Sequence, residues 1–283
     1  LYEPNISQQK YLLNEIKRTT KSVKKFYNIS KLNIKKLHFK SSIEEAVKKA
    51  DLIQENVPEN LQIKKKIIKK ISNFAKSKAI IASSSSGLLP SKIQNSCKFP
   101  GRFIIAHPFN PVYLLPLVEI VRGKKTNEET IKKSEIFYKS VDMSPLVLKK
   151  EVEGYLSDRL QESMWRESLH ILNANLASTE DLDNAIIHGP GLRWSLMGIF
   201  LTYHLAGGKA GMKHMLEQFG PALKLPWTKL KAPKLSKKLS SRVIKGTRQQ
   251  AKGKSVAKIS NIRDEYLVNL QKLRKRYENK VRK

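Results

Sequence analysis

The first 150 residues alternate between two hydrophobic periodicities. Segments such as residues 60–75, where apolar side chains recur every three or four positions, are typical of amphipathic helices, and short apolar runs are typical of buried strands. This alternation predicts a doubly wound, largely parallel α/β sheet. The predicted strands are residues 37–39, 51–55, 79–82, 102–106, 117–121 and 146–149, and the predicted helices are residues 42–49, residues 60–75 and a helix capped at Thr126.

The pattern changes after residue 151, where the predicted strands end and helical periodicity continues. A weak linker at residues 248–255 precedes a basic amphipathic segment at 256–282. We therefore expect a sheet domain over residues 1–150, a helical domain over 151–247 and a basic helical extension over 248–283. The predicted helices after residue 151 are 156–172, 179–187, 196–205, 211–219 and 256–282.

Polar side chains gather at the ends of four predicted strands, in residues 55–59, residues 83–86, residues 107–110 and at Glu119. Ligands of open α/β sheets bind beyond the carboxyl ends of strands, so these clusters are the best candidates for a site. His107 and Glu119 lie on what the pattern predicts as neighbouring strands. A carboxylate placed against the imidazole would fix its tautomer for general base catalysis. The alternative is a loop histidine beside a surface glutamate.

The formal net charge of +31 would by itself indicate a nucleic-acid partner. The excess lies in the flanks, because residues 1–82 carry 19 basic against 7 acidic side chains and residues 229–283 carry 19 against 3. The flanking charge is mostly lysine on helical patterns, whereas base recognition relies on clustered arginine and aromatic side chains. We therefore expect no specific nucleic-acid partner.

A single cysteine, Cys97, cannot form an internal disulfide framework and is typical of a reducing cytosol. The most hydrophobic stretch, residues 103–121, is interrupted by histidine, proline, asparagine and glutamate, which argues against a membrane span. We expect a cytoplasmic protein with no membrane partner and no metal site.

Four motifs resemble the 3-hydroxyacyl-CoA dehydrogenase superfamily in their order and spacing. They are residues 82–88 (ASSSSGL), 107–111 (HPFNP), 117–119 (LVE) and 154–160 (GYLSDRL). The resemblance implies a Rossmann-type sheet domain followed by an all-helical C-terminal domain, with NAD as the cofactor. It also implies a set of catalytic residues, which are Ser86, His107, Glu119 and Asp158.

The implied roles follow the family pattern. His107 is the general base, Glu119 orients it, and Ser86 binds the substrate oxygen. Asp158 departs from the pattern, because most of the family has asparagine there, and this argues against a standard acyl-CoA enzyme. The implied cofactor-binding residues are Glu3, Glu59, Lys64, Ser86 and Asn110, and an acid at Glu3 favours NAD over NADP.

Three later motifs resemble the branch of this superfamily that acts on L-carnitine. They are residues 189–198 (GPGLRWSLMG), 200–208 (FLTYHLAGG) and 219–227 (FGPALKLPW). The resemblance implies oxidation of the 3-hydroxyl of L-carnitine to 3-dehydrocarnitine, in a homodimer whose residues 151–247 serve substrate binding and dimerisation. Aromatic faces suit a quaternary ammonium group, and Arg193 suits the substrate carboxylate. Two roles stay open for Asp158, which either orients the catalytic residues or opposes the cationic end of the substrate. The candidate substrate residues are Arg193, Trp194, Phe200, Tyr203 and Trp165, although aromatic side chains on helices more often serve packing.

This superfamily begins with a strand and a Gly-x-Gly-x-x-Gly turn, and residues 1–283 contain no such turn. Residues 1–4 resemble the end of the second strand, so we expect the first βα unit to be absent and the sequence to be a fragment. On that basis we expect residues 1–283 alone to bind NAD negligibly and to show no dehydrogenase activity. Two other functions stay open, a related dehydrogenase of the L-gulonate type and a catalytically inactive remnant with a binding or structural role.

Overall fold

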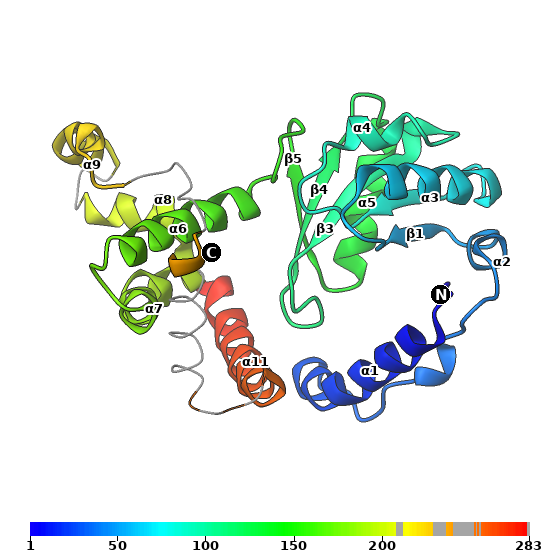
Figure 1. Cartoon of the computed structure of the whole chain (residues 1–283), viewed down its shortest axis with the longest axis horizontal. Helices are drawn as coiled ribbons and strands as arrows, with labels where there is room; N and C mark the ends of the chain where they lie inside the picture. The colour runs from blue at the N-terminus through cyan, green and yellow to red at the C-terminus, as the bar shows by residue number, and fades with distance from the viewer. Residues whose placement is uncertain (208–211, 229–235, 240–251, 253, 255, 282–283) are drawn as a thin grey trace. The chain divides into compact units, whose positions relative to one another are not determined.

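A computed structural model describes residues 1–207, 212–228, 236–239, 252, 254 and 256–281. The chain forms two compact units, Leu1–Arg159 and Leu160–Lys283. The first unit contains a five-stranded sheet, and the described part of the second unit is helical (Figure 1).

The sheet has the strand order β1-β2-β3-β4-β5. Strands β1, β2 and β3 are parallel, β4 runs antiparallel to β3, and β5 runs parallel to β4. The carboxyl ends of β1, β2 and β3 and the amino end of β4 therefore meet at one edge, where the candidate site lies. The strands are β1 (Leu52–Glu55), β2 (Ile80–Ser83), β3 (Phe103–Pro108), β4 (Leu117–Arg122) and β5 (Ser144–Leu148).

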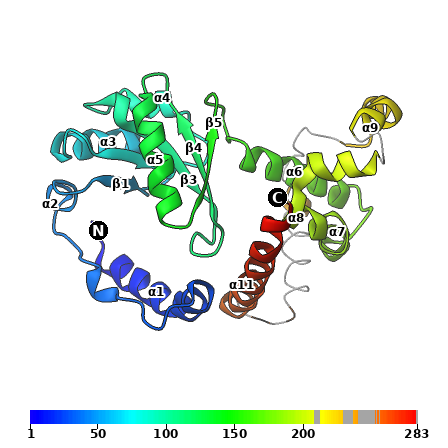
Figure 2. The same ribbon diagram turned by 180° about the vertical axis from the view of Figure 1, so that it is seen from behind.

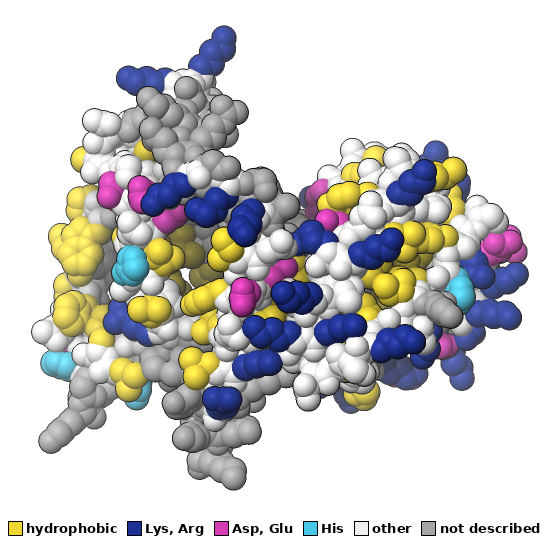
Figure 3. All heavy atoms as spheres, turned by 90° about the horizontal axis from the view of Figure 1, so that it is seen from below, with side chains coloured by type: hydrophobic (Ala, Val, Ile, Leu, Met, Phe, Trp, Pro, Cys, Tyr) yellow, Lys and Arg dark blue, Asp and Glu magenta, His cyan; other side chains and the backbone are white. Residues whose placement is uncertain are grey.

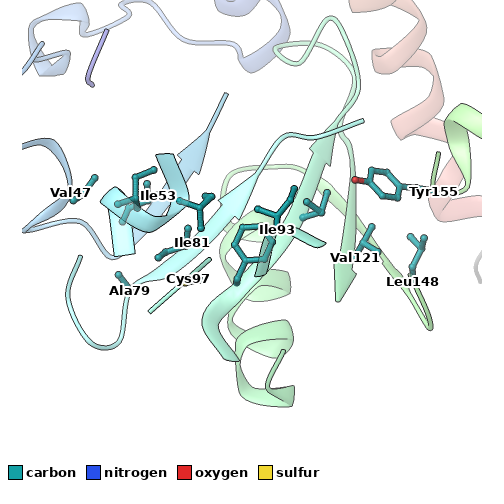
Figure 4. Packing of buried hydrophobic residues seen from close by; sticks show 13 residues of the cluster. Val47, Ile53, Ala79, Ile81, Ile93, Cys97, Val121, Leu148 and Tyr155 are labelled. Atoms are coloured by element: carbon teal, nitrogen blue, oxygen red, sulfur yellow. The ribbon is translucent and has the colours of Figure 1, made fainter. Parts of the chain in front are cut away.

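Hydrophobic clusters cover both faces of the sheet, because successive side chains of a strand point to opposite faces. Ile81 and Ile105 pack in one cluster with residues of α2 (Ile43–Val47), α3 (Leu61–Phe74) and α4 (Pro90–Gln94). That cluster is drawn in Figure 4. The neighbouring strand residues Ile80, Ala82, Ile104 and Ala106 pack on the other face with α5 (Glu128–Ser140). Figures 1 and 2 show α3 and α5 on opposite faces of the sheet.

The structure contains a long N-terminal helix, α1 (Ile6–Tyr27), which the sequence analysis did not predict. The Asn5 side chain caps it by accepting hydrogen bonds from the backbone N–H groups of Ser7 and Gln8. Apolar residues recur along it at helical spacing, as at Leu12, Ile16 and Val23, but Thr19 is its one buried residue.

The strand predicted at residues 37–39 is not formed, and a short 3₁₀ helix, η1 (Ile34–Lys36), precedes this segment. Its backbone hydrogen bonds go to Leu1, which donates to the carbonyl of His38 and accepts from the N–H of Lys40. Residues 37–39 themselves have no regular secondary structure.

The start of α5 also differs from the expectation, because the helix begins at Glu128 after Asn127 and not after Thr126. The Thr126 hydroxyl donates instead to the carbonyl oxygen of Phe103 and accepts from the N–H of Gly123. A tertiary hydrogen bond has thus replaced the local cap that the sequence indicated. A 3₁₀ turn, η2 (Pro100–Arg102), leads into β3.

Four helices of the second unit match the predicted positions closely, and α8 is longer than predicted. α8 begins at Pro190 after Gly189, and a residue in the left-handed region, Gly198 with φ 66°, interrupts it. The predicted linker at residues 248–255 lies largely outside the described residues. The elements are α6 (Ser157–Asn173), which begins in the first unit, α7 (Thr179–Ile187), α8 (Pro190–Ala206), α9 (Met212–Phe219), η4 (Gly220–Lys224) and α11 (Val256–Val281).

Basic side chains outnumber acidic ones on the face shown in Figure 3, where they stand among uncharged side chains. Among the described helices, none is both long enough and apolar enough to cross a membrane. The functions predicted for residues 151–247 and 248–283 stay predictions.

Replacement of Ile105 by alanine should destabilise the sheet unit by about 2–5 kcal/mol, because the side chain is fully buried and its loss leaves a cavity. Ile136→Ala on α5 is the matched control, since Ile136 is 68% exposed and should change stability by less than about 0.5 kcal/mol. Urea denaturation followed by far-UV circular dichroism measures both. An equal decrease in the free energy of unfolding of the two variants would contradict the assignment of Ile105 to the core.

Candidate active site

The candidate site lies at the edge of the sheet where three parallel strands finish in polar residues. Glu55 is the last residue of β1, Ser83 is the last residue of β2, and His107 is the penultimate residue of β3. Glu119 enters from the antiparallel strand β4. All four side chains belong to buried residues, so each polar group needs a partner within the protein.

His107 and Glu119 are directly opposite each other in the β3–β4 ladder. His107 Nδ1 lies 3.0 Å from Glu119 Oε2. The other carboxylate oxygen, Oε1, accepts hydrogen bonds of 3.0 Å from the backbone N–H groups of Leu156 and Ser157. The carboxylate is fully buried and is therefore compensated by the imidazole on one side and by the start of α6 on the other.

These hydrogen bonds define the protonation of the pair. Burial alone raises the pKa of Glu119, but the hydrogen bonds from His107, Ser157 and Leu156 outweigh burial and hold the pKa below its ordinary value of 4.5. An ionised carboxylate can only accept, so Nδ1 of His107 carries the hydrogen. The opposite ring nitrogen, Nε2, is then the atom of the neutral imidazole that can accept a proton.

Asp158 lies beside that nitrogen. Its Oδ2 is 3.8 Å from His107 Nε2, and its side chain is 36% exposed. Asp158 stands in the first turn of α6, directly after the two residues whose N–H groups hold Glu119. The predicted residues His107, Glu119 and Asp158 are therefore brought together.

Tyr155 completes this arrangement and was missed by the sequence analysis. Gly154 with φ 71° and Tyr155 with φ 47° both adopt the left-handed conformation, in the turn that leads to the N–H groups of Leu156 and Ser157. The Tyr155 ring is buried at one end of the cluster in Figure 4, with its centroid 5.5 Å from that of His107. Its hydroxyl donates to the carbonyl of Leu88 at 2.9 Å. This bond connects residues 84–88 after β2, here called the serine loop, to the turn that holds Glu119.

A second cluster of charges surrounds Lys64, whose side chain is only 1% exposed. Its ammonium group donates to Glu55 Oε1 and to the carbonyl of Val57, each at 3.0 Å, and lies 3.5 Å from Glu59 Oε2. The Ser83 hydroxyl donates to Glu55 at 2.5 Å. The three hydrogens of the ammonium group thus have acceptors within the protein.

Glu59 connects this cluster to the serine loop. Its Oε1 accepts from the Ser85 hydroxyl at 2.5 Å and from the N–H groups of Ser86 and Gly87. Burial alone raises the pKa of Glu59, but these hydrogen bonds and the Lys64 charge lower it overall. Glu59, Lys64 and Ser86 were predicted from the sequence as cofactor-binding residues, whereas no role was predicted for Glu55, Ser83 or Ser85. Their position at or just after the ends of β1 and β2 could have identified them as candidates from the sequence.

The other predicted cofactor residues are exposed or have local partners. Ser86, which follows β2, and Asn110, which follows β3, are exposed. The carboxylate of Glu3 accepts from the N–H of Asn5, and its carbonyl accepts from the side chain of Gln9. The contacts of Glu3 are thus with the start of α1, and its role in binding the ribose stays a prediction.

The predicted substrate residues belong to the second unit. Phe200 is 82% exposed, and the side chains of Arg193, Tyr203 and Trp165 are also exposed, while Trp194 is partly buried. Arg193, Trp194, Phe200 and Tyr203 lie on α8, and Trp165 lies on α6. Their role in substrate binding stays a prediction. Among the described residues, no group of three histidine, cysteine, aspartate or glutamate side chains could hold a metal ion.

Two family models match the chain in succession. The NAD-binding domain of 3-hydroxyacyl-CoA dehydrogenase matches residues 1–152, and the C-terminal domain of the same family matches residues 154–246. The chain belongs to the 3-hydroxyacyl-CoA dehydrogenase family. This family member is an NAD-dependent dehydrogenase that oxidises a 3-hydroxyl group.

Curated relatives of this dehydrogenase include L-carnitine dehydrogenases of several bacteria. That of Bacillus cereus is 57% identical over 86% of this chain and 74% of its own length. That of Staphylococcus epidermidis is 45% identical over 97% of this chain and 86% of its own length. Both matches extend through the sheet unit into the helical unit.

Solved structures share the fold at low sequence identity. An NAD⁺-dependent 5-formyl-3-hydroxy-2-methylpyridine 4-carboxylic acid 5-dehydrogenase has a TM-score of 0.79 at 21% identity, covering 97% of this chain and 89% of that chain. The (S)-3-hydroxybutyryl-CoA dehydrogenase PaaH1 from Ralstonia eutropha has a TM-score of 0.59 at 23% identity, with 77% of each chain covered. A Rossmann-like sheet followed by a helical domain, as the sequence analysis predicted, is confirmed.

The donor and acceptor set at the sheet edge fits the nicotinamide half of NAD. The ribose hydroxyls need acceptors and the carboxamide needs a donor and an acceptor. Exposed groups of both kinds lie at this edge, in the Glu59 carboxylate, the Ser86 hydroxyl and the Asn110 amide. Lys64 is too deeply buried to add to this set directly, but its ammonium lies against Glu59.

Glu119 should make stability depend on pH. Because its pKa is lowered in the folded protein, its contribution to stability is complete above the ordinary value of 4.5 and is lost as pH falls through the lower folded value. Glu119→Gln should therefore lower the free energy of unfolding more at pH 7 than at about pH 3.5.

Urea denaturation at both pH values measures this difference. Glu44→Gln on α2 is the control, because Glu44 is exposed and its replacement should leave the pH dependence unchanged. The assigned ionisation of Glu119 would be refuted if the difference in free energy of unfolding between wild type and Glu119→Gln were the same at both pH values.

Proposed function

We propose that this dehydrogenase oxidises the 3-hydroxyl group of L-carnitine to give 3-dehydrocarnitine. One observation carries the proposal, namely 57% identity to an L-carnitine dehydrogenase over 86% of the chain. The geometry supports it, because the His107–Glu119 pair at the sheet edge is the arrangement that an alcohol oxidation needs.

In the proposed reaction His107 Nε2 removes the proton of the substrate hydroxyl. When NAD is bound, it supplies the acceptor for the hydride that leaves C3. The imidazolium that results keeps its Nδ1–H bond to Glu119, whose negative charge stabilises it. The backbone N–H groups of Leu156 and Ser157 hold Glu119 in place throughout. Ser86 binds the substrate oxygen, and Glu59, Ser86 and Asn110 would hold the nicotinamide half of the cofactor.

We also propose that the protein is a cytoplasmic homodimer. The second unit presents large apolar side chains to solvent, among them Leu192, Ile199, Phe200 and Leu205 on α8, and such side chains are typical of subunit interfaces. A free, buried cysteine and use of NAD fit a reducing compartment.

Substrate choice tests the proposed function. Residues 1–283, joined to a βα unit with the Gly-x-Gly-x-x-Gly turn that they lack, should reduce NAD with L-carnitine at a kcat/KM at least about tenfold above that for L-gulonate or 3-hydroxybutyryl-CoA, the scale on which binding sites discriminate dissimilar substrates. NADH absorbance measures all three. Faster turnover of either competitor would overturn the assignment to L-carnitine.

Two variants test the roles of the catalytic pair. His107→Ala should lower kcat by about 10²–10⁴-fold, the usual contribution of a general base, and should leave the Kd of NAD within a few-fold. Glu119→Gln should cost roughly 10- to 100-fold, as the loss of an orienting partner does.

His188→Ala, at an exposed histidine after α7, is the control and should retain full activity. Activity of His107→Ala above a tenth of wild type would place the base elsewhere.

A further inference from the structure

Asp158 occupies a position that the proposed reaction does not explain. General base catalysis requires Nε2 of His107 and an ionised Glu119, and Asp158 is a second carboxyl group on the opposite side of the same ring. Its Oδ2 lies 3.8 Å from Nε2, the atom that takes the substrate proton, so it borders the place of the reacting hydroxyl. Unlike Glu119, which is fully buried, Asp158 is partly exposed and accessible to a ligand.

The chemistry of L-carnitine brings a cation to the same place. Its quaternary nitrogen is bonded to the carbon next to C3, so the nitrogen lies about 3–4 Å from the hydroxyl oxygen in either staggered conformation. A quaternary ammonium group has no hydrogen to donate, and a protein therefore recognises it through charge and contact alone. A carboxylate beside the hydroxyl site supplies such a charge.

We propose that Asp158 is the specificity-determining residue for the cationic nitrogen of the substrate. The inference rests on L-carnitine as the substrate and adds the group that selects its charged end. Asp158 attracts the trimethylammonium group electrostatically while His107 binds the neighbouring hydroxyl, so that both groups of the substrate are recognised at the start of α6. A neutral substrate of the same shape gains the contact with His107 but not the attraction to Asp158.

An alternative role predicts a different outcome. If Asp158 acts only on His107, by orienting the ring or passing on its proton, its loss slows every substrate equally. The two roles are separated by a pair of substrates that differ only in charge. The matched pair is L-carnitine and 3-hydroxy-5,5-dimethylhexanoate of the same configuration at C3, in which a carbon atom replaces the quaternary nitrogen.

The experiment measures kcat/KM of the protein completed with the glycine-rich βα unit, as wild type and as Asp158→Asn, with both substrates. The ratio of the two values for one enzyme sample does not depend on how much of that sample is folded. We expect Asp158→Asn to lower the L-carnitine-to-isostere ratio by about tenfold, the effect of one partly screened charge pair. Asp158→Glu, which restores the charge, should recover part of the ratio.

Glu162→Gln is the matched control, because it removes one negative charge a turn further along α6 and should leave the ratio within twofold of wild type. Added salt should lower the ratio in wild type and change it little in Asp158→Asn.

The possible results distinguish a failure of the role proposed for Asp158 from a failure of the proposed function. An unchanged ratio in Asp158→Asn, with L-carnitine still oxidised by wild type, overturns the role of Asp158 and leaves the proposed function intact. A wild-type protein that does not oxidise L-carnitine overturns both.

Discussion

The buried carboxylate of Glu119 is the constraint on which the candidate site depends. An ionised carboxyl group in the interior is costly unless it is paired and hydrogen-bonded. Glu119 meets this requirement with His107 on β3 and with two backbone N–H groups at the start of α6. The strand that carries the base, the strand that carries the acid and the helix that follows the sheet are therefore held together by one group.

The same physical requirement explains the second charged cluster. Lys64 is buried beside Glu55, and its charge is acceptable there because Glu55, Glu59 and the carbonyl of Val57 surround it. Glu59 in turn fixes the serine loop through the N–H groups of Ser86 and Gly87. Two compensated clusters thus fix the loops at the sheet edge, and Tyr155 links the loops through its hydroxyl bond to Leu88.

Sequence reasoning predicted the strands well where a run of apolar residues was fully buried, as in residues 79–82 against the observed strand Ile80–Ser83. It failed where local and tertiary signals disagreed. Residues 37–39 formed no strand, and Thr126 bonded to Phe103 instead of capping α5. α1 was missed although its apolar residues recur at helical spacing, because residues 1–4 were interpreted as the end of a strand and the residues after them were given no element.

The order of residues is enough to predict the alternation of strands and helices over residues 42–150 and the polar residues near the strand ends, because both follow from the spacing of side chains along the chain. It also predicted His107 opposite Glu119, since consecutive strands joined by a short connection usually pair. The folded chain was needed to identify which groups neutralise Glu119, how deeply Lys64 is buried and that Tyr155 contacts His107. Those partners are distant in the sequence, and the need to compensate a buried charge specifies that a partner exists without specifying which residue it is.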